Sequence, residues 1–217
     1  MTLEDVYYFS QKKQLHPELF SHINKAVQCS MANAADAAEV QRRLNLLSRS
    51  KGNEHLRQAS NFVAEAATYT LLEEAGEGPH WVPEVADKKM PDLEAGQHPV
   101  EVKHLNSPRV EHEALANGEM YGGSVDTNYD TGLDKKIGDF IKDTREKFTS
   151  YNLLKRGVAE PEGTLYLYFT KSIDAGIADG ISWMTKMQDR IESIVKKHLL
   201  EKDRIALIVT DIDHILD

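Results

Sequence analysis

The sequence predicts an α/β protein with a mixed central β-sheet flanked by helices, preceded by an N-terminal helical extension. With 217 residues, 41% of them hydrophobic, the chain can bury one substantial core. Short β-rich runs separated by tight turns favour an antiparallel meander, and later strands alternate with helical segments, which favours parallel crossovers. We expect the extension to span residues 1–52 and the α/β domain to span residues 53–217.

The extension is expected to consist of helices. "PELFSHINKAVQCS" places Pro17 in a first-turn position, and "AADAAEVQRRLNLLSR" spaces Val40, Leu44 and Leu47 at helical intervals. The basic residues of this region are Arg42, Arg43, Arg49, Lys51 and Arg57. Such a pattern is typical of a solvated helix face, and a surface that faces phosphate is the alternative.

The elements of the α/β domain follow in order. A long helix is expected over residues 54–75, ended by Gly76. Three strands come next, "HWVPEV", "MPDLEA" and "PVEVKHL", the last two joined by the turn "GQH". After a polar loop over residues 106–130, the amphipathic helix "LDKKIGDFIKDTREKFTSYNLL" precedes the strand "TLYLYFT". A helix, "GISWMTKMQDRIESIVKKHLL", and a buried strand, "RIALIVTDI", complete the domain.

Charge and cysteine content restrict the class of protein. The net charge is −9, and residues 58–130 hold 14 acidic against 4 basic side chains. Such an acidic centre would repel a phosphate backbone unless a cation were bound there. The single cysteine, Cys29, allows no internal disulfide, and no apolar run reaches the ~20 residues of a membrane helix. We expect a cytoplasmic protein without a membrane partner.

The stretch "MPDLEAGQHPVEVKHL" places charged residues where a buried hairpin is expected. Because side chains alternate along a strand, Glu101 and Lys103 share one face while Val100 and Val102 occupy the other. Asp92 begins the preceding antiparallel strand and can converge with Glu101. Two such carboxylates repel unless one is protonated or a cation bridges them. A pair of ligands that are both oxygen suits Mg²⁺ or Mn²⁺. Such an ion makes a bound water more acidic, so that the water can act as the nucleophile of a hydrolysis.

Two further residues belong to this interpretation. Lys103 could orient the water or stabilise charge that develops on a phosphate. Glu65, on the preceding helix, has no basic residue three or four positions away. We expect Glu65 to bind a metal ion, Lys103 or water across the helix–strand interface, since an unpaired carboxylate among apolar groups is costly. The alternative is that Glu65 lies exposed on one stripe of the helix.

The motif resembles that of a known enzyme superfamily. Pro91–Asp92, then eight residues, then Glu101-Val102-Lys103 is similar to the signature of PD-(D/E)xK nucleases, which share a restriction-endonuclease-like core. The preceding helix with Glu65, the three-strand meander, and the later helix and strand also resemble that core. The resemblance covers residues 53–170.

The resemblance implies roles for five residues. Asp92 and Glu101 would ligate the metal ion, together with the Val102 carbonyl, and Glu65 would be the helix carboxylate of the same metal site. Lys103 would be the catalytic lysine. The expected activity is metal-dependent hydrolysis of phosphodiester bonds in nucleic acid, with DNA favoured over RNA.

Other binding residues and functions remain open at this stage. Candidate contacts to nucleic acid are Arg109, Lys135, Lys136, Lys142 and Arg145. The main alternative is a catalytically inactive module that binds nucleic acid or protein with the same fold, and a hydrolase of small phosphate esters is a third option. Cleavage of both strands of a duplex would suit a twofold homodimer.

Overall fold

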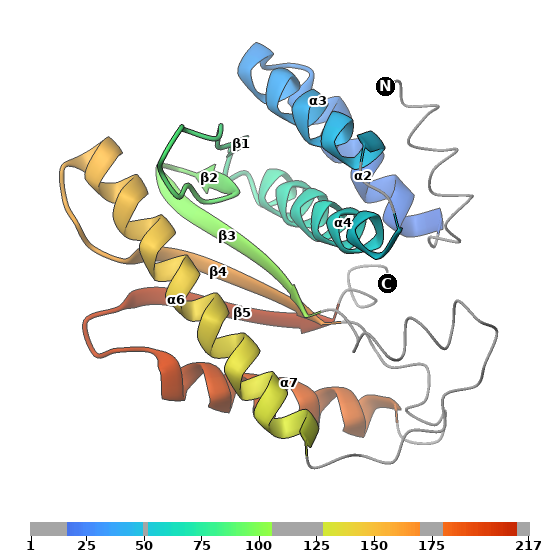
Figure 1. The fold of residues 1–217 in the computed structure, drawn as a ribbon. Helices are drawn as coiled ribbons and strands as arrows, with labels where there is room; N and C mark the ends of the chain where they lie inside the picture. The colour runs from blue at the N-terminus through green and yellow to red at the C-terminus, as the bar shows by residue number, and fades with distance from the viewer. Residues whose placement is uncertain (1–16, 50–51, 106–127, 170–179, 212–217) are drawn as a thin grey trace.

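The computed structural model describes residues 17–49, 52–105, 128–169 and 180–211 (Figure 1). This part of the chain is an α/β protein with a five-stranded mixed sheet and five helices, and the N-terminal helices precede the sheet. The predicted fold class and order of elements are therefore confirmed. The helices are α2 (Pro17–Ser30), α3 (Ala34–Arg49), α4 (Gly52–Glu74), α6 (Asn128–Arg156) and α7 (Gly180–His198). The strands are β1 (Pro79–Trp81), β2 (Leu93–Ala95), β3 (His98–Leu105), β4 (Glu162–Phe169) and β5 (Arg204–Asp211).

The strands lie in the sheet in chain order. β1, β2 and β3 pair antiparallel, whereas β3, β4 and β5 pair parallel. Gly96 and Gln97 both have positive φ angles, of 53° and 71°, which a tight hairpin between β2 and β3 requires. Gly76 follows α4, two residues after its last residue, with a left-handed φ of 75°.

Helices cover the two faces of the sheet (Figure 1). On one face, α4 packs on β3, and residues of α2 and α3 join the same apolar cluster as Val100 and Val102. On the other face, α6 and α7 pack on residues such as Leu165, Leu167 and Val209. The face of β3 that carries Glu101 and Lys103 is therefore covered by a helix. The charged residues of this strand thus lie inside the molecule.

The first hairpin is shorter than the strand beside it. β2 pairs with β3 only as far as Val100, whereas β3 continues to Leu105. Beyond that point β3 has no strand on its β2 side among the described residues, and side chains from both helical layers can meet over its edge. Asp92, the residue before β2, lies at this position.

The N-terminal helices are anchored to the first strand by buried polar contacts. The Asp36 carboxylate accepts a hydrogen bond of 2.7 Å from the Trp81 backbone N–H. The Trp81 indole Nε1 donates to the Ser30 hydroxyl at 2.8 Å. Ala26, Val40 and Leu44 share one apolar cluster with α4 and the sheet, so the described helices of the extension and the sheet have a common core.

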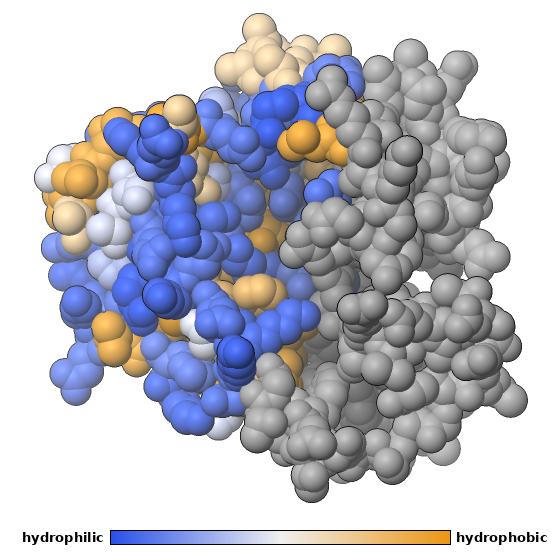
Figure 2. All heavy atoms as spheres, in the orientation of Figure 1, coloured by the Kyte–Doolittle hydropathy of each residue, from blue (hydrophilic) through white to orange (hydrophobic). Residues whose placement is uncertain are grey.

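The surface of the described residues is mainly polar on the face shown in Figure 2. Its apolar patches are small, and one lies near the C-terminal end of α6, where Leu153 and Leu154 are exposed. Within the described segments, no helix is both long and apolar enough to cross a membrane.

Candidate active site

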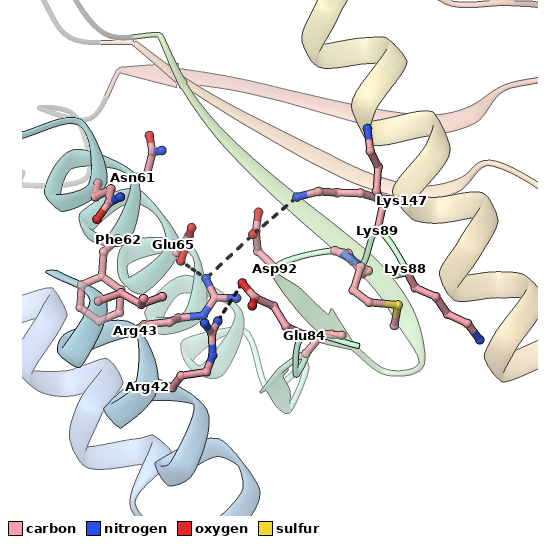
Figure 3. Close-up of a pocket in the computed structure, with 15 residues that line it drawn as sticks. Arg42, Arg43, Asn61, Phe62, Glu65, Glu84, Lys88, Lys89, Asp92 and Lys147 are labelled. Atoms are coloured by element: carbon pink, nitrogen blue, oxygen red, sulfur yellow. Dashed lines mark hydrogen bonds and ion pairs between the residues drawn. The ribbon is translucent and has the colours of Figure 1, made fainter. Parts of the chain in front are cut away.

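A cavity of about 440 Å³ opens beside the start of β2 (Figure 3). Its walls come from α3, α4, the segment between β1 and β2, and α6. The acidic residues that line it are Glu65, Glu84 and Asp92, and the basic ones are Arg42, Arg43, Lys88, Lys89 and Lys147. Two of the predicted site residues, Glu65 and Asp92, therefore face the same cavity.

Asp92 is held at the free edge of β3. Its Oδ2 accepts a hydrogen bond of 2.9 Å from the Val102 N–H, which in a longer hairpin would pair with β2. Its Oδ1 lies 3.9 Å from a guanidinium nitrogen of Arg43 and 3.9 Å from Lys147 Nζ. Because the N–H and C=O of one strand residue point to the same edge, the Val102 carbonyl is also directed to this side.

Glu101 lies on β3 and is completely buried. Its Oε1 lies 2.6 Å from Lys103 Nζ and 2.6 Å from Lys147 Nζ, so two lysines share one carboxylate oxygen. Lys103 also donates to Asp143 of α6 at 2.9 Å. The other oxygen of Glu101, Oε2, is buried and has no hydrogen-bond partner among the described residues.

Glu65 reaches the site from α4, and its partner is Arg43 of α3. The Arg43 side chain is 13% exposed, its Nε donates to Glu39 at 2.9 Å, and its guanidinium carbon lies 5.0 Å from the centre of the Trp81 ring. The expectation that this arginine belongs to a solvated face is therefore wrong. The reason is that α3 packs against α4 and turns Arg43 inward.

The carboxylates of the site influence one another electrostatically. Burial, together with the nearby Asp92 charge, raises the pKa of Glu65 and the pKa of Glu101 to about 7 each. Burial alone would also raise the pKa of Asp92, but Lys147, Arg43 and Lys103 outweigh it and lower that pKa. The pKa of Lys103 is raised by Glu101, Asp92 and Asp143 despite burial. Asp92 therefore stays ionised at neutral pH, where Glu65 and Glu101 are partly protonated.

A hard divalent cation needs several oxygen ligands. In the described part of the chain, no three His, Cys, Asp or Glu side chains are grouped closely enough to hold a metal ion. Basic side chains lie between the carboxylates instead. Even so, Glu101 Oε2 is buried without a partner among the described residues, Asp92 Oδ1 has cations only at 3.9 Å, and all donors are oxygen. Asp92, Glu101 and the Val102 carbonyl offer only oxygen, which is the donor type that Mg²⁺ or Mn²⁺ takes.

The predicted contacts to nucleic acid are in different surroundings. Lys135 and Lys142 are exposed on α6, and their role as phosphate contacts stays a prediction. Lys136 Nζ lies 5.8 Å from the centre of the Phe140 ring. Arg109 lies outside the described residues. Lys147 of the same helix, absent from the predicted set, contacts Glu101 directly.

Arg145 is bound within the protein. Its Nε and Nη2 donate to the buried Asp203 carboxylate at 3.0 and 2.5 Å, and Nη2 also donates to the His198 carbonyl at 3.2 Å.

We expect Arg145→Gln to lower the free energy of unfolding by about 2 kcal/mol, because Asp203 would lose its charged donor. Urea denaturation would measure this, with Lys142→Gln as the exposed control on the same helix. An equal effect of both substitutions would contradict this structural role.

Comparison with known proteins adds no information about this site. No family model, curated protein or solved structure matches the chain. The function is therefore inferred from the side chains that meet at the edge of β3 and from the signature in the sequence.

Proposed function

We propose that this protein is a metal-dependent nuclease of the PD-(D/E)xK type that hydrolyses phosphodiester bonds in nucleic acid, with DNA favoured over RNA. The observation that carries the proposal is the arrangement beside the free edge of β3, where Glu65 and Asp92 line one cavity and Lys147 lies 3.9 Å from Asp92 and 2.6 Å from Glu101. Glu65 comes from α4, Glu101 from β3 and Asp92 from the position just before β2, which agrees with the element order that the resemblance implies. The order of helix, three-strand meander, helix and strand also supports it.

The proposed roles follow from the contacts. Asp92, Glu101 and the Val102 carbonyl would hold the ion. A bound Mg²⁺ would supply positive charge for the phosphate and a more acidic water for attack on phosphorus. Lys103, positioned by Glu101 and Asp143, would donate a hydrogen bond to an oxygen of the phosphate as negative charge develops there.

Lys147 offers a second ammonium group at the same oxygen of Glu101. Its Nζ is 2.6 Å from Glu101 and 3.9 Å from Asp92, and it lines the cavity, which Lys103 does not. Lys147 would therefore balance the charge of both carboxylates and keep their side chains directed toward the free edge of β3.

A cleavage assay tests the proposal. We expect Lys103→Ala to abolish cleavage while the folded structure persists, because Lys147 still pairs with Glu101. Plasmid, single-stranded DNA, RNA and nucleotide substrates should each be incubated with and without Mg²⁺ or Mn²⁺. Lys196→Ala, an exposed lysine of α7, is the matched control. If purified Lys103→Ala cut DNA and RNA as fast as the parent protein, the assignment would be wrong.

One observation favours a second candidate, a binding module that hydrolyses nothing. Arg43, Lys103 and Lys147 already pair with the three carboxylates, so their charges balance without a metal ion. Calorimetric titration with Mg²⁺ and Mn²⁺ separates the two candidates. Ion binding that disappears in an Asp92 variant supports the enzyme, and the absence of any ion binding supports the module.

A further inference from the structure

The cavity carries more basic than acidic side chains although the whole chain has a net charge of −9. Five of its lining residues are basic and three are acidic. In an acidic protein, a local excess of positive charge within a concave site favours an anionic ligand. Arg43 and Lys147 each lie 3.9 Å from Asp92, and the other three basic residues, Arg42, Lys88 and Lys89, are here called the outer wall of the cavity.

Two basic residues of the outer wall are available to a ligand. Lys88 is exposed, and its ammonium group has no hydrogen-bond or ion-pair partner among the described side chains. Arg42 is about one-third exposed, and its partners are Glu39 and the exposed Glu84. Since Glu39 also accepts a hydrogen bond from the Nε of Arg43, it keeps a partner if Arg42 turns toward a ligand.

Arg43 provides a fixed guanidinium deeper in the cavity. Glu39, Glu65 and the Trp81 ring hold it from three directions, and Figure 3 shows it between Glu65 and Asp92. Its Nη2 has no acceptor among the described residues. A guanidinium held in this way can bind a phosphate oxygen at little entropic cost, because its side chain is already ordered.

The remaining lining gives the cavity an apolar part. Leu46, Phe62, Val82 and Met90 contribute to its wall. Its volume of about 440 Å³ is within the ~300–1,000 Å³ of small-molecule sites. This size suits one nucleotide, with a flat base and an anionic phosphate. A paired duplex, whose major groove alone is ~12 Å wide, would have to lie outside it.

We propose that the cavity binds one nucleotide of a single strand beside Asp92, with its phosphate held by Arg42, Arg43 and Lys88. This inference rests on the proposed nuclease function and specifies its substrate as single-stranded nucleic acid. Two of the three phosphate-binding side chains come from α3, so the N-terminal extension forms part of the substrate site. The neighbouring phosphodiester would then lie at the edge of β3, near Lys103 and Glu101.

Binding can be measured separately from cleavage. A fluorescein-labelled single-stranded DNA oligonucleotide is titrated with protein in EDTA, and its anisotropy gives the dissociation constant. We expect Arg42→Gln and Lys88→Gln each to weaken binding about fivefold to tenfold, since each removes one charge-assisted hydrogen bond. In each variant the slope of the logarithm of the binding constant against the logarithm of the salt concentration should become shallower by about 0.7, the value expected for one phosphate. Lys196→Gln, on α7, should leave both quantities unchanged.

Strand preference and folding complete the test. A duplex with both ends closed by hairpins should bind at least about tenfold more weakly than the single strand, because its bases cannot enter the cavity. Arg43→Lys keeps the charge but removes the planar fork, so it should weaken binding, and it should also lower the unfolding temperature because Glu39, Glu65 and the Trp81 ring hold the guanidinium. Unchanged binding in both Arg42→Gln and Lys88→Gln, or tighter binding of the closed duplex, would overturn the inference. Loss of cleavage in Lys103→Ala would still support the nuclease in that case.

Discussion

Asp92→Asn is expected to reduce kcat/KM for nucleic acid cleavage by about 10³-fold or more, which corresponds to ~4 kcal/mol of lost transition-state stabilisation. Asparagine has nearly the same shape, and its side-chain oxygen can still accept the Val102 N–H bond of 2.9 Å. It cannot supply the negative charge that the ion requires. The substitution therefore separates the charge of this residue from its structural contact at the edge of β3.

Two measurements check this expectation. Titration calorimetry should show that Mn²⁺ binds to the parent protein and not to Asp92→Asn, and urea denaturation should show a single transition at a lower urea concentration, because Lys147, Arg43 and Lys103 stabilise the Asp92 charge in the folded state. Glu94→Gln is the matched control, because Glu94 lies two residues further along and contacts Tyr151 and Lys155 instead of the cavity. Activity of Asp92→Asn within tenfold of the parent would exclude Asp92 as an essential ligand.

Much of the fold could be predicted because its signals are local. The alternating strand "TLYLYFT" and the turn "GQH" depend on neighbouring residues, and both occur as expected. The apolar stripe of α6 places Ile137, Ile141 and Phe148 in the core, as its spacing indicates. The alternation of β3 also placed Glu101 and Lys103 on one face correctly, although the helix that covers this face could not be inferred from the strand alone.

The basic half of the site was harder to predict. Arg43 meets Glu65 across 22 residues of sequence, and Lys147 meets Glu101 across 46. Neither contact follows from periodicity, because each depends on how two elements distant in sequence pack together. A weaker local signal was present: Glu39 and Arg43 are four residues apart, directly beside the core positions Val40 and Leu44. An ion pair at such a border often lies partly inside the protein.

Asp92 shows how the two kinds of information combine. The sequence "MPDLEA" placed it at the beginning of a strand, since Pro91 suits only the start of one, whereas β2 begins one residue later, at Leu93. Its contact with β3 depends on the difference in length between β2 and β3. Because β2 ends early, the Val102 N–H has no strand partner there among the described residues and donates to the Asp92 carboxylate instead. The sequence thus indicates which residue lies at the edge, and the tertiary structure determines which groups it meets there.

Trp81→Ala is expected to lower the free energy of unfolding by about 3–5 kcal/mol, a large part of the stability of a domain. The indole is buried, lies 6.0 Å from Phe62 and 5.4 Å from Tyr69 between ring centres, and supports the guanidinium of Arg43. It also donates to Ser30 of α2 at 2.8 Å. Its removal would leave a cavity where α2, α3, α4 and β1 meet.

Urea denaturation followed by far-ultraviolet circular dichroism measures this change in stability. Because one core contains both the N-terminal helices and the sheet, the variant should still unfold in a single transition, at a lower urea concentration. His80→Ala is the control, since the half-exposed His80 also contacts Asp36, at 2.9 Å, and it should cost less than ~1 kcal/mol. A Trp81→Ala protein as stable as the parent, or one that unfolds in two separate steps, would mean that the extension is not integral to the core. Arg43 could then not be held at the cavity by this packing.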